Sequence, residues 1–218
     1  RPAIATLIPT LSGHCIVADA GANADCKPEY LVQFAVMAKI VAENLLQIKE
    51  DPLNPGRYLG TNAPEFRTHA AGQIVTLNGS PSSNADQMQV TYITHKKTAD
   101  TADNPHADHS GFYRDPLPLS DGALIAAHTA EYRGDTNTGT RANPASRYSF
   151  RLKTLTLSAN GFFTPDQLLT TGITKTISYW DPDVLVSFSG TLWELQPVEV
   201  RARTRPARLA PALPAPEQ

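Results

Sequence analysis

The pattern of apolar and polar positions changes character near residue 50. Residues 15–18 form a short apolar run typical of a buried parallel strand, and residues 19–23 follow it with turn-forming side chains. Pro28 and Glu29 then suit the first turn of a helix. The apolar positions that continue from there are spaced three and four apart, which predicts one face of a helix: Leu31, Phe34, Ala38, Val41, Leu45 and Ile48. The first fifty residues therefore predict a strand, a turn and a helix, a short α/β fragment.

The remainder of the chain predicts strands. A turn-forming segment, residues 51–56, contains two prolines and a glycine and marks the expected boundary. Beyond it, short runs rich in Val, Ile, Thr and aromatic residues predict strands at 73–77, 88–94, 123–129, 148–157, 174–180 and 184–195. Long polar loops are expected at 96–118 and 132–146, and an extended Pro/Arg tail at 201–218. The expected organisation is thus α/β over 1–50, β-rich over 51–200 and a tail over 201–218.

Composition narrows the classes of function. The chain carries 19 basic and 21 acidic residues, a net charge of -2, so charge gives no reason to expect nucleic acid as a partner. No apolar run is long enough to predict a membrane span. The start, residues 1–6, lacks a methionine and a basic region followed by an apolar core, so we expect an internal cut and no signal peptide there.

Residues 19–29, followed by residues 31–37, closely resemble the phosphate acyltransferase (PlsX) family. The resemblance covers about residues 1–50 and implies a Rossmann-like fold without a cofactor. It also implies transfer of an acyl group from acyl carrier protein to inorganic phosphate in phospholipid synthesis. On this resemblance we expect Lys27, Asn23 and Asp25 to be catalytic, and Gly21, Ala22 and Asn23 to bind phosphate near a helix N-terminus.

The second stretch resembles bacterial proteins related to the alpha subunit of hydrazine synthase. The resemblance rests on residues 56–60, 63–66, 69–75, 113–122 and 179–183. It implies part of a β-propeller, whose open sheet edges favour self-association. The two families imply different compartments, because acyltransferase chemistry is cytoplasmic and relatives of hydrazine synthase are usually exported.

Two hypotheses for function follow from these resemblances. The leading hypothesis is a composite or truncated chain, joined near residues 48–52, that lacks a complete active site and acts as a propeller-like binding or structural module. The alternative is a phosphate acyltransferase that acts on acyl carrier protein thioesters.

A loop that contains histidines and an aspartate suggests a third kind of chemistry, metal binding. His106, Asp108 and His109, with His95 and His128 nearby in sequence, offer nitrogen and oxygen ligands for a divalent metal. The spacing matches none of the strong zinc patterns, and the competing interpretation is an ordinary polar loop.

The two cysteines, Cys15 and Cys26, are eleven residues apart. Reduced thiols are favoured over a disulfide, because no secreted framework surrounds them.

Overall fold

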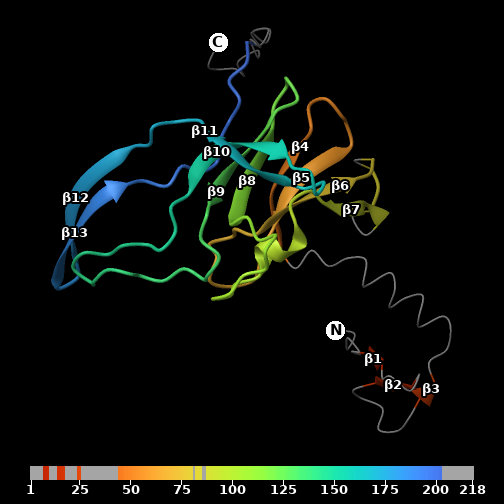
Figure 1. Ribbon diagram of the computed structural model, residues 1–218, viewed down its shortest axis with the longest axis horizontal. Coiled ribbons are helices and arrows are strands. Elements are labelled where there is room, and N and C mark those ends of the chain that lie inside the picture. Colours follow the sequence, from red (N-terminus) through yellow and green to blue (C-terminus); the bar gives the residue numbers. More distant parts are fainter. Residues whose placement is uncertain are drawn as a thin grey trace, which may run out of the picture.

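The computed structural model describes residues 44–80, 82–84 and 87–202, together with the backbone of three short strands nearer the N-terminus (Figure 1). Those three strands form an antiparallel sheet of order β1-β2-β3: β1 Leu7–Pro9, β2 His14–Val17 and β3 Ala24–Asp25. The strand predicted at 15–18 is therefore present as β2. The parallel pairing expected for it is wrong, because β2 pairs antiparallel with both neighbours.

The first large sheet is a four-stranded antiparallel meander of order β4-β5-β6-β7. Its strands are β4 Leu45–Glu50, β5 Arg57–Asn62, β6 Gln73–Asn78 and β7 Gln89–Tyr92. Residues 51–56 form the turn from β4 to β5. In this turn Asp51 accepts hydrogen bonds from the Leu53 amide (2.9 Å) and the Arg57 guanidinium (3.1 Å). The residues that mark the expected domain boundary thus join two paired strands, and the division into three regions stays a prediction.

The second large sheet has the same topology, with the order β8-β9-β10-β11. Its strands are β8 Phe112–Pro118, β9 Leu124–Thr129, β10 Arg151–Leu157 and β11 Phe163–Leu168. A short 3-10 helix, η2 Lys96–Ala99, lies between the sheets in sequence.

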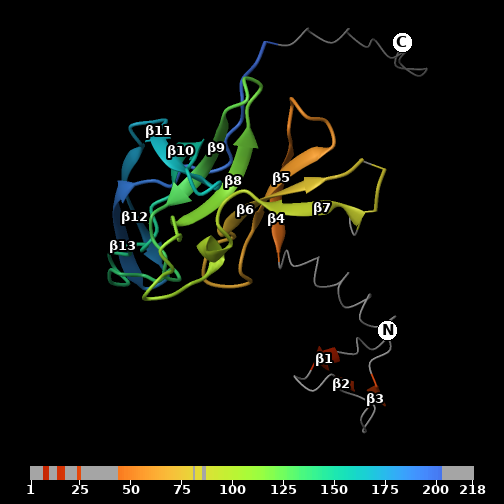
Figure 2. The ribbon, with the colours of Figure 1, turned by 45° about the vertical axis from the view of Figure 1, so that its right-hand side comes forward.

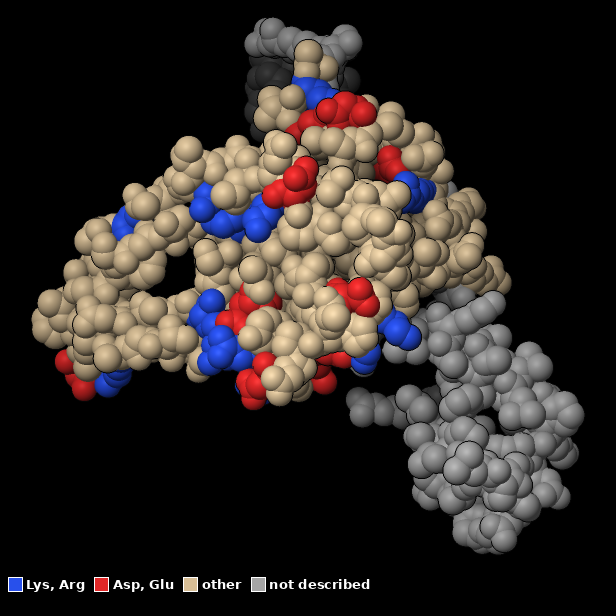
Figure 3. Space-filling view, in the orientation of Figure 1, with Lys and Arg blue, Asp and Glu red and all other residues tan. Residues whose placement is uncertain are grey.

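The last two strands, β12 Thr174–Asp181 and β13 Val184–Thr191, form a hairpin that projects from the two large sheets (Figures 1 and 2). Every residue of β12 is exposed, including Trp180 and Tyr179. The space-filling view shows an opening between this hairpin and the rest of the surface (Figure 3).

The apolar core of the two large sheets consists of two clusters. Tyr113 on β8 and Gly72 before β6 exchange two backbone hydrogen bonds, of 2.8 and 2.9 Å, which tie the sheets together. The first core cluster draws on both sheets: Leu59, Ile74, Tyr113, Leu124, Ala126 and Leu155. The second cluster consists mainly of aromatic residues: Ala71, Phe112, Ala127, Tyr148 and Phe150.

The mainly β character predicted for residues beyond 50 is confirmed, and the details of the fold prediction need correction. Within the described part of the chain, the sheets close into neither a propeller nor a barrel. Leu45 and Ile48, placed on a helix by their spacing, lie instead in strand β4. The rest of the expected helix, residues 28–43, and the tail from residue 203 lie outside the described residues, and a Rossmann-like fragment is not shown.

No helix within the described residues is long and apolar enough to cross a membrane. Self-association through sheet edges stays a prediction.

Gly111, at the entry to β8, has a backbone conformation that only glycine adopts easily. Its φ is +97°, and a Cβ atom there would lie 2.2 Å from the Thr129 carbonyl oxygen. We expect Gly111→Ala to lower the free energy of unfolding by about 2 kcal/mol or more, because backbone strain and overpacking add. Urea unfolding followed by circular dichroism measures this loss.

Gly161 provides the matched control. It also has a positive φ, +83°, but nothing lies within 4 Å of its Cβ position. Gly161→Ala should therefore lower the free energy of unfolding only through backbone strain, by about 1 kcal/mol. Equal losses in the two variants would contradict the steric explanation.

Candidate functional site

A histidine–aspartate cluster, defined as His95, His106 and Asp108, is the most compact group of titratable side chains with metal-binding chemistry in the described residues. One ligand atom from each residue lies within 4.8 Å of the other two. Asp108 Oδ2 lies 3.7 Å from His95 Nε2 and 3.3 Å from His106 Nδ1. The carboxylate therefore faces a nitrogen of each ring.

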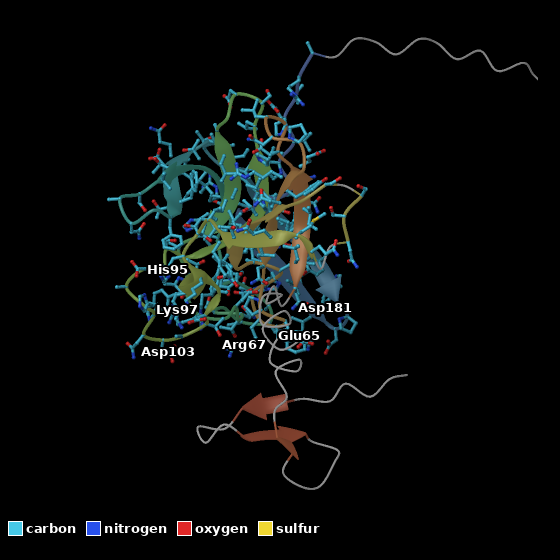
Figure 4. The ribbon with its side chains drawn as sticks, turned by 90° about the vertical axis from the view of Figure 1, so that its right-hand side faces the viewer. Glu65, Arg67, His95, Lys97, Asp103 and Asp181 are labelled. Carbon is cyan, nitrogen blue, oxygen red and sulfur yellow. The ribbon has the colours of Figure 1, made fainter. Side chains whose placement is uncertain are left out.

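His95 is held at the start of η2, which follows β7. Its side-chain Nδ1 accepts a hydrogen bond from the Lys97 amide at 3.3 Å. Its carbonyl accepts two more, from the amide (2.9 Å) and the hydroxyl (2.7 Å) of Thr98, a fully buried residue. Figure 4 shows His95 and Lys97 close together at the outer surface. These bonds fix the backbone of His95, and they leave Nε2 directed toward Asp108.

His106 and Asp108 come from a tight turn in the following loop. The His106 carbonyl accepts from the His109 amide at 2.9 Å, and His106 Nδ1 accepts from the Asp108 amide at 3.2 Å. The rings of His106 and His95 stack, with their centroids 5.3 Å apart and an interplanar angle of 14°. Phe162 packs its ring edge-on against His95 at 5.0 Å. Side-chain packing thus brings together histidines that are eleven residues apart in sequence.

The structure directs the ring of His109 away from the cluster and toward backbone groups. Its Nε2 lies 3.0 Å from the Asp100 carbonyl, and its Nδ1 accepts from the Gly111 amide at 3.1 Å. Burial lowers the pKa of His109, although the Asp100 contacts oppose the shift. Of the three metal ligands expected from the sequence, the structure brings His106 and Asp108 together and puts His95 beside them where His109 was expected.

His128, the other histidine near the expected metal loop, is buried in β9. It is 2% exposed, and its Nε2 lies 2.6 Å from the Ser110 carbonyl. The Lys153 ammonium lies 3.2 Å from its Nδ1. Burial is the main reason that the pKa of His128 falls to about 4, with a smaller effect from the Lys153 charge. A neutral ring with both nitrogens engaged is a structural residue of the core.

Four basic residues that the sequence analysis missed line a cavity of about 400 Å³ beside β9 and β10: Arg133, Arg147, Arg151 and Lys153. Two of its arginines are paired, Arg133 with Glu131 at 2.8 Å and Arg151 with Glu194 at 3.3 Å. The signal was present in β10, where Arg151 and Lys153 are two residues apart and so lie on one face of the strand.

The acyltransferase-like residues cannot be placed in the same way. Gly21, Ala22, Asn23 and Lys27 lie outside the described residues, and for Asp25 only the backbone of β3 is described. Their assignment as phosphate-binding and catalytic residues therefore stays a prediction.

The known proteins that this chain resembles match its N-terminal part. The family model "Fatty acid synthesis protein" matches residues 1–56. The phosphate acyltransferase of Endomicrobium trichonymphae is 53% identical over 49 residues, which are 22% of this chain and 14% of that protein. The enzyme of Moorella thermoacetica is 42% identical over 81 residues, 37% of this chain and 24% of its own length. That of Thermodesulfovibrio yellowstonii is 69% identical over 39 residues, 18% of this chain and 11% of its own length.

These matches confirm the resemblance of the N-terminal portion to phosphate acyltransferase, and each spans less than a quarter of the relative's length. No solved structure matches the chain. The leading hypothesis, a propeller-like module related to hydrazine synthase, is wrong. The proteins and the family model that match this chain are named for phosphate acyltransferase and fatty acid synthesis.

Proposed function

We propose that the chain functions in phosphate acyl transfer through its N-terminal segment, residues 1–56. The observation that carries the proposal is the match of these residues to the fatty acid synthesis family, together with identities of 42% to 69% to phosphate acyltransferases. The acyl donor in this proposal is an acyl carrier protein thioester, and the acceptor is inorganic phosphate. The product is an acyl phosphate for phospholipid synthesis.

The proposed reaction is a direct acyl transfer. A phosphate oxygen attacks the thioester carbonyl, the C–O bond forms, the C–S bond breaks, and the carrier thiol leaves with a proton. Such a reaction needs donors that hold the phosphate and stabilise the developing oxyanion. Lys27 and the backbone amides of Gly21, Ala22 and Asn23 are assigned that role, and Asn23 and Asp25 complete the polar set at the turn.

Lys27→Ala tests this proposal on the full chain. Removal of a donor to a developing oxyanion lowers turnover by about 100-fold or more, and we expect a loss of that size. The assay supplies acyl carrier protein thioester and phosphate, and it traps the acyl phosphate with hydroxylamine.

Lys175→Ala is the matched control, because this lysine lies in the exposed strand β12, outside the segment that matches the family. Its turnover should equal that of the unmodified chain. Product formation no faster than in the reaction without protein would overturn the proposal. An equal loss in the Lys27 and Lys175 variants would overturn the assignment of Lys27.

A further inference from the structure

We propose that the histidine–aspartate cluster is a binding site for one divalent transition-metal ion of the zinc type. His95 contributes Nε2, His106 contributes Nδ1 and Asp108 contributes its carboxylate. This site lies in the β-rich part of the chain and does not depend on the proposed acyl transfer.

The separations of the ligand atoms fit a single ion. Ligands about 2.0–2.2 Å from a tetrahedral zinc ion are about 3.3–3.6 Å from one another. The Asp108 carboxylate lies 3.3 Å from His106 Nδ1 and 3.7 Å from His95 Nε2. All three ligand atoms lie within 4.8 Å, so a small inward movement of side chains completes the coordination.

The ligand set selects the class of metal. Two imidazoles with one carboxylate suit zinc, cobalt or nickel, whereas calcium and magnesium prefer sites made of oxygen ligands. Three protein ligands leave a fourth position for water. The side chains of His106 and Asp108 are 50% and 41% exposed, so an ion reaches them from solvent without any opening of the fold.

The ring protons determine what changes on binding. His106 Nδ1 accepts the Asp108 amide proton at 3.2 Å, so the neutral ring carries its own proton on Nε2, and a metal ion at Nδ1 takes the lone pair that this hydrogen bond uses. His95 Nδ1 accepts from the Lys97 amide, so the proton of neutral His95 is on Nε2 and faces Asp108. Coordination through His95 Nε2 therefore shifts that proton to Nδ1, and it replaces one long hydrogen bond of 3.3 Å by a metal bond.

The surrounding structure limits the movement of the ligands before an ion arrives. The buried Thr98 anchors the His95 backbone, and Phe162 packs against the ring edge. The rings of His95 and His106 stack with their centroids 5.3 Å apart, so the two imidazoles lie next to each other. Ligands that are already held in place lose less side-chain entropy on binding a metal than ligands on a mobile loop do.

Isothermal titration of the metal-free full chain with Zn²⁺ tests the site. We expect one zinc ion whose affinity falls at least tenfold in His95→Ala, in His106→Gln and in Asp108→Asn. Two controls come from the same loop: Asp103→Asn removes an exposed carboxylate, and His109→Gln removes the histidine that faces the Asp100 backbone. Both should retain zinc affinity within a factor of about three.

Co²⁺ substitution identifies the ligands independently of affinity. We expect visible d–d bands that persist in the Cys15→Ser/Cys26→Ser double variant and disappear in His106→Gln. Sulfur-to-cobalt charge transfer in the near ultraviolet would show cysteine ligation and overturn the assignment. Equal zinc affinity in the unmodified chain and the three ligand variants, with circular dichroism showing that all are folded, would overturn the site itself.

Discussion

Phe150→Ala is expected to lower the free energy of unfolding by about 3–5 kcal/mol, the cost of removing a fully buried aromatic ring. Phe150 is 0% exposed, and its ring meets those of Tyr148 and Trp193 edge-on at centroid distances of 5.4 and 5.0 Å. The Arg114 guanidinium lies over the same ring, 5.7 Å from its centroid. One substitution therefore removes three contacts and leaves a cavity.

The loss is large because Phe150 connects segments far apart in sequence. Trp193 follows β13, and its indole nitrogen donates a hydrogen bond to the Tyr148 carbonyl at 3.0 Å. Removal of the ring between them weakens the attachment of the segment after β13 to the second sheet. Urea unfolding measures the change in stability, and tryptophan fluorescence, to which exposed Trp180 also contributes, reports the change around Trp193.

Phe66→Ala is the matched control, because Phe66 is the same residue type but 71% exposed. It should change the free energy of unfolding by no more than about 0.5 kcal/mol. If the Phe150 and Phe66 variants unfold at the same urea concentration, the aromatic cluster does not stabilise the fold as described.

Runs rich in Val, Ile, Thr and aromatic residues made several strands predictable. The strand predicted at 123–129 is β9, and the one predicted at 174–180 is β12. Strand β8 was missed because Pro116 and Pro118 lie within it. Pro116 lies at an irregularity between Arg114 and Leu117, where Asp115 has a φ of +53°, and Pro118 is the last residue of the strand. Proline is tolerated at such bulges because the local ladder hydrogen bond is already absent.

The β4 segment shows why helical spacing can be overruled. Leu45 and Ile48 continue the three- and four-residue steps of the segment before them, yet the backbone pairs with β5. Gln47, with a φ of +56°, shifts the register between Leu46 and Lys49. Long-range pairing with β5 therefore outweighs local periodicity, and no pattern within residues 31–48 contains that information.

The sequence predicted the chemistry of the candidate site but not all of the residues that form it. His106 and Asp108 are close in sequence, and the sequence identified both. The third ligand depends on the stacking of His95 on His106 and on Phe162, which comes from the loop between β10 and β11. Such contacts follow from tertiary packing, whereas spacing alone gave equal weight to His109.

Acidification is expected to destabilise the chain through His128. The pKa of this buried ring is about 4 in the folded chain, against about 6.5 for an exposed histidine. Well above pH 6.5 the ring is neutral in both states, so its titration does not change the free energy of unfolding. Between pH 6.5 and 4 the unfolded chain binds a proton that the folded chain does not, and stability falls as the pH falls.

The size of the effect follows from the separation of the two pKa values. Each pH unit in this window lowers the free energy of unfolding by up to about 1.4 kcal/mol, for a total on the order of 3 kcal/mol by pH 4. His109, whose pKa burial also lowers, adds to the same slope. The measurement must therefore separate the two histidines.

His128→Gln makes that separation, because glutamine does not titrate and still offers an amide donor for the Ser110 carbonyl, which lies 2.6 Å from Nε2 in the unmodified chain. Urea unfolding at a series of pH values should show a smaller slope in this variant than in the unmodified chain, by up to one proton between pH 4 and 6.5. His109→Gln should leave the His128 part of the slope in place. Identical slopes in the unmodified chain and in His128→Gln would mean that His128 is not the buried neutral group that the contacts with Ser110 and Lys153 describe.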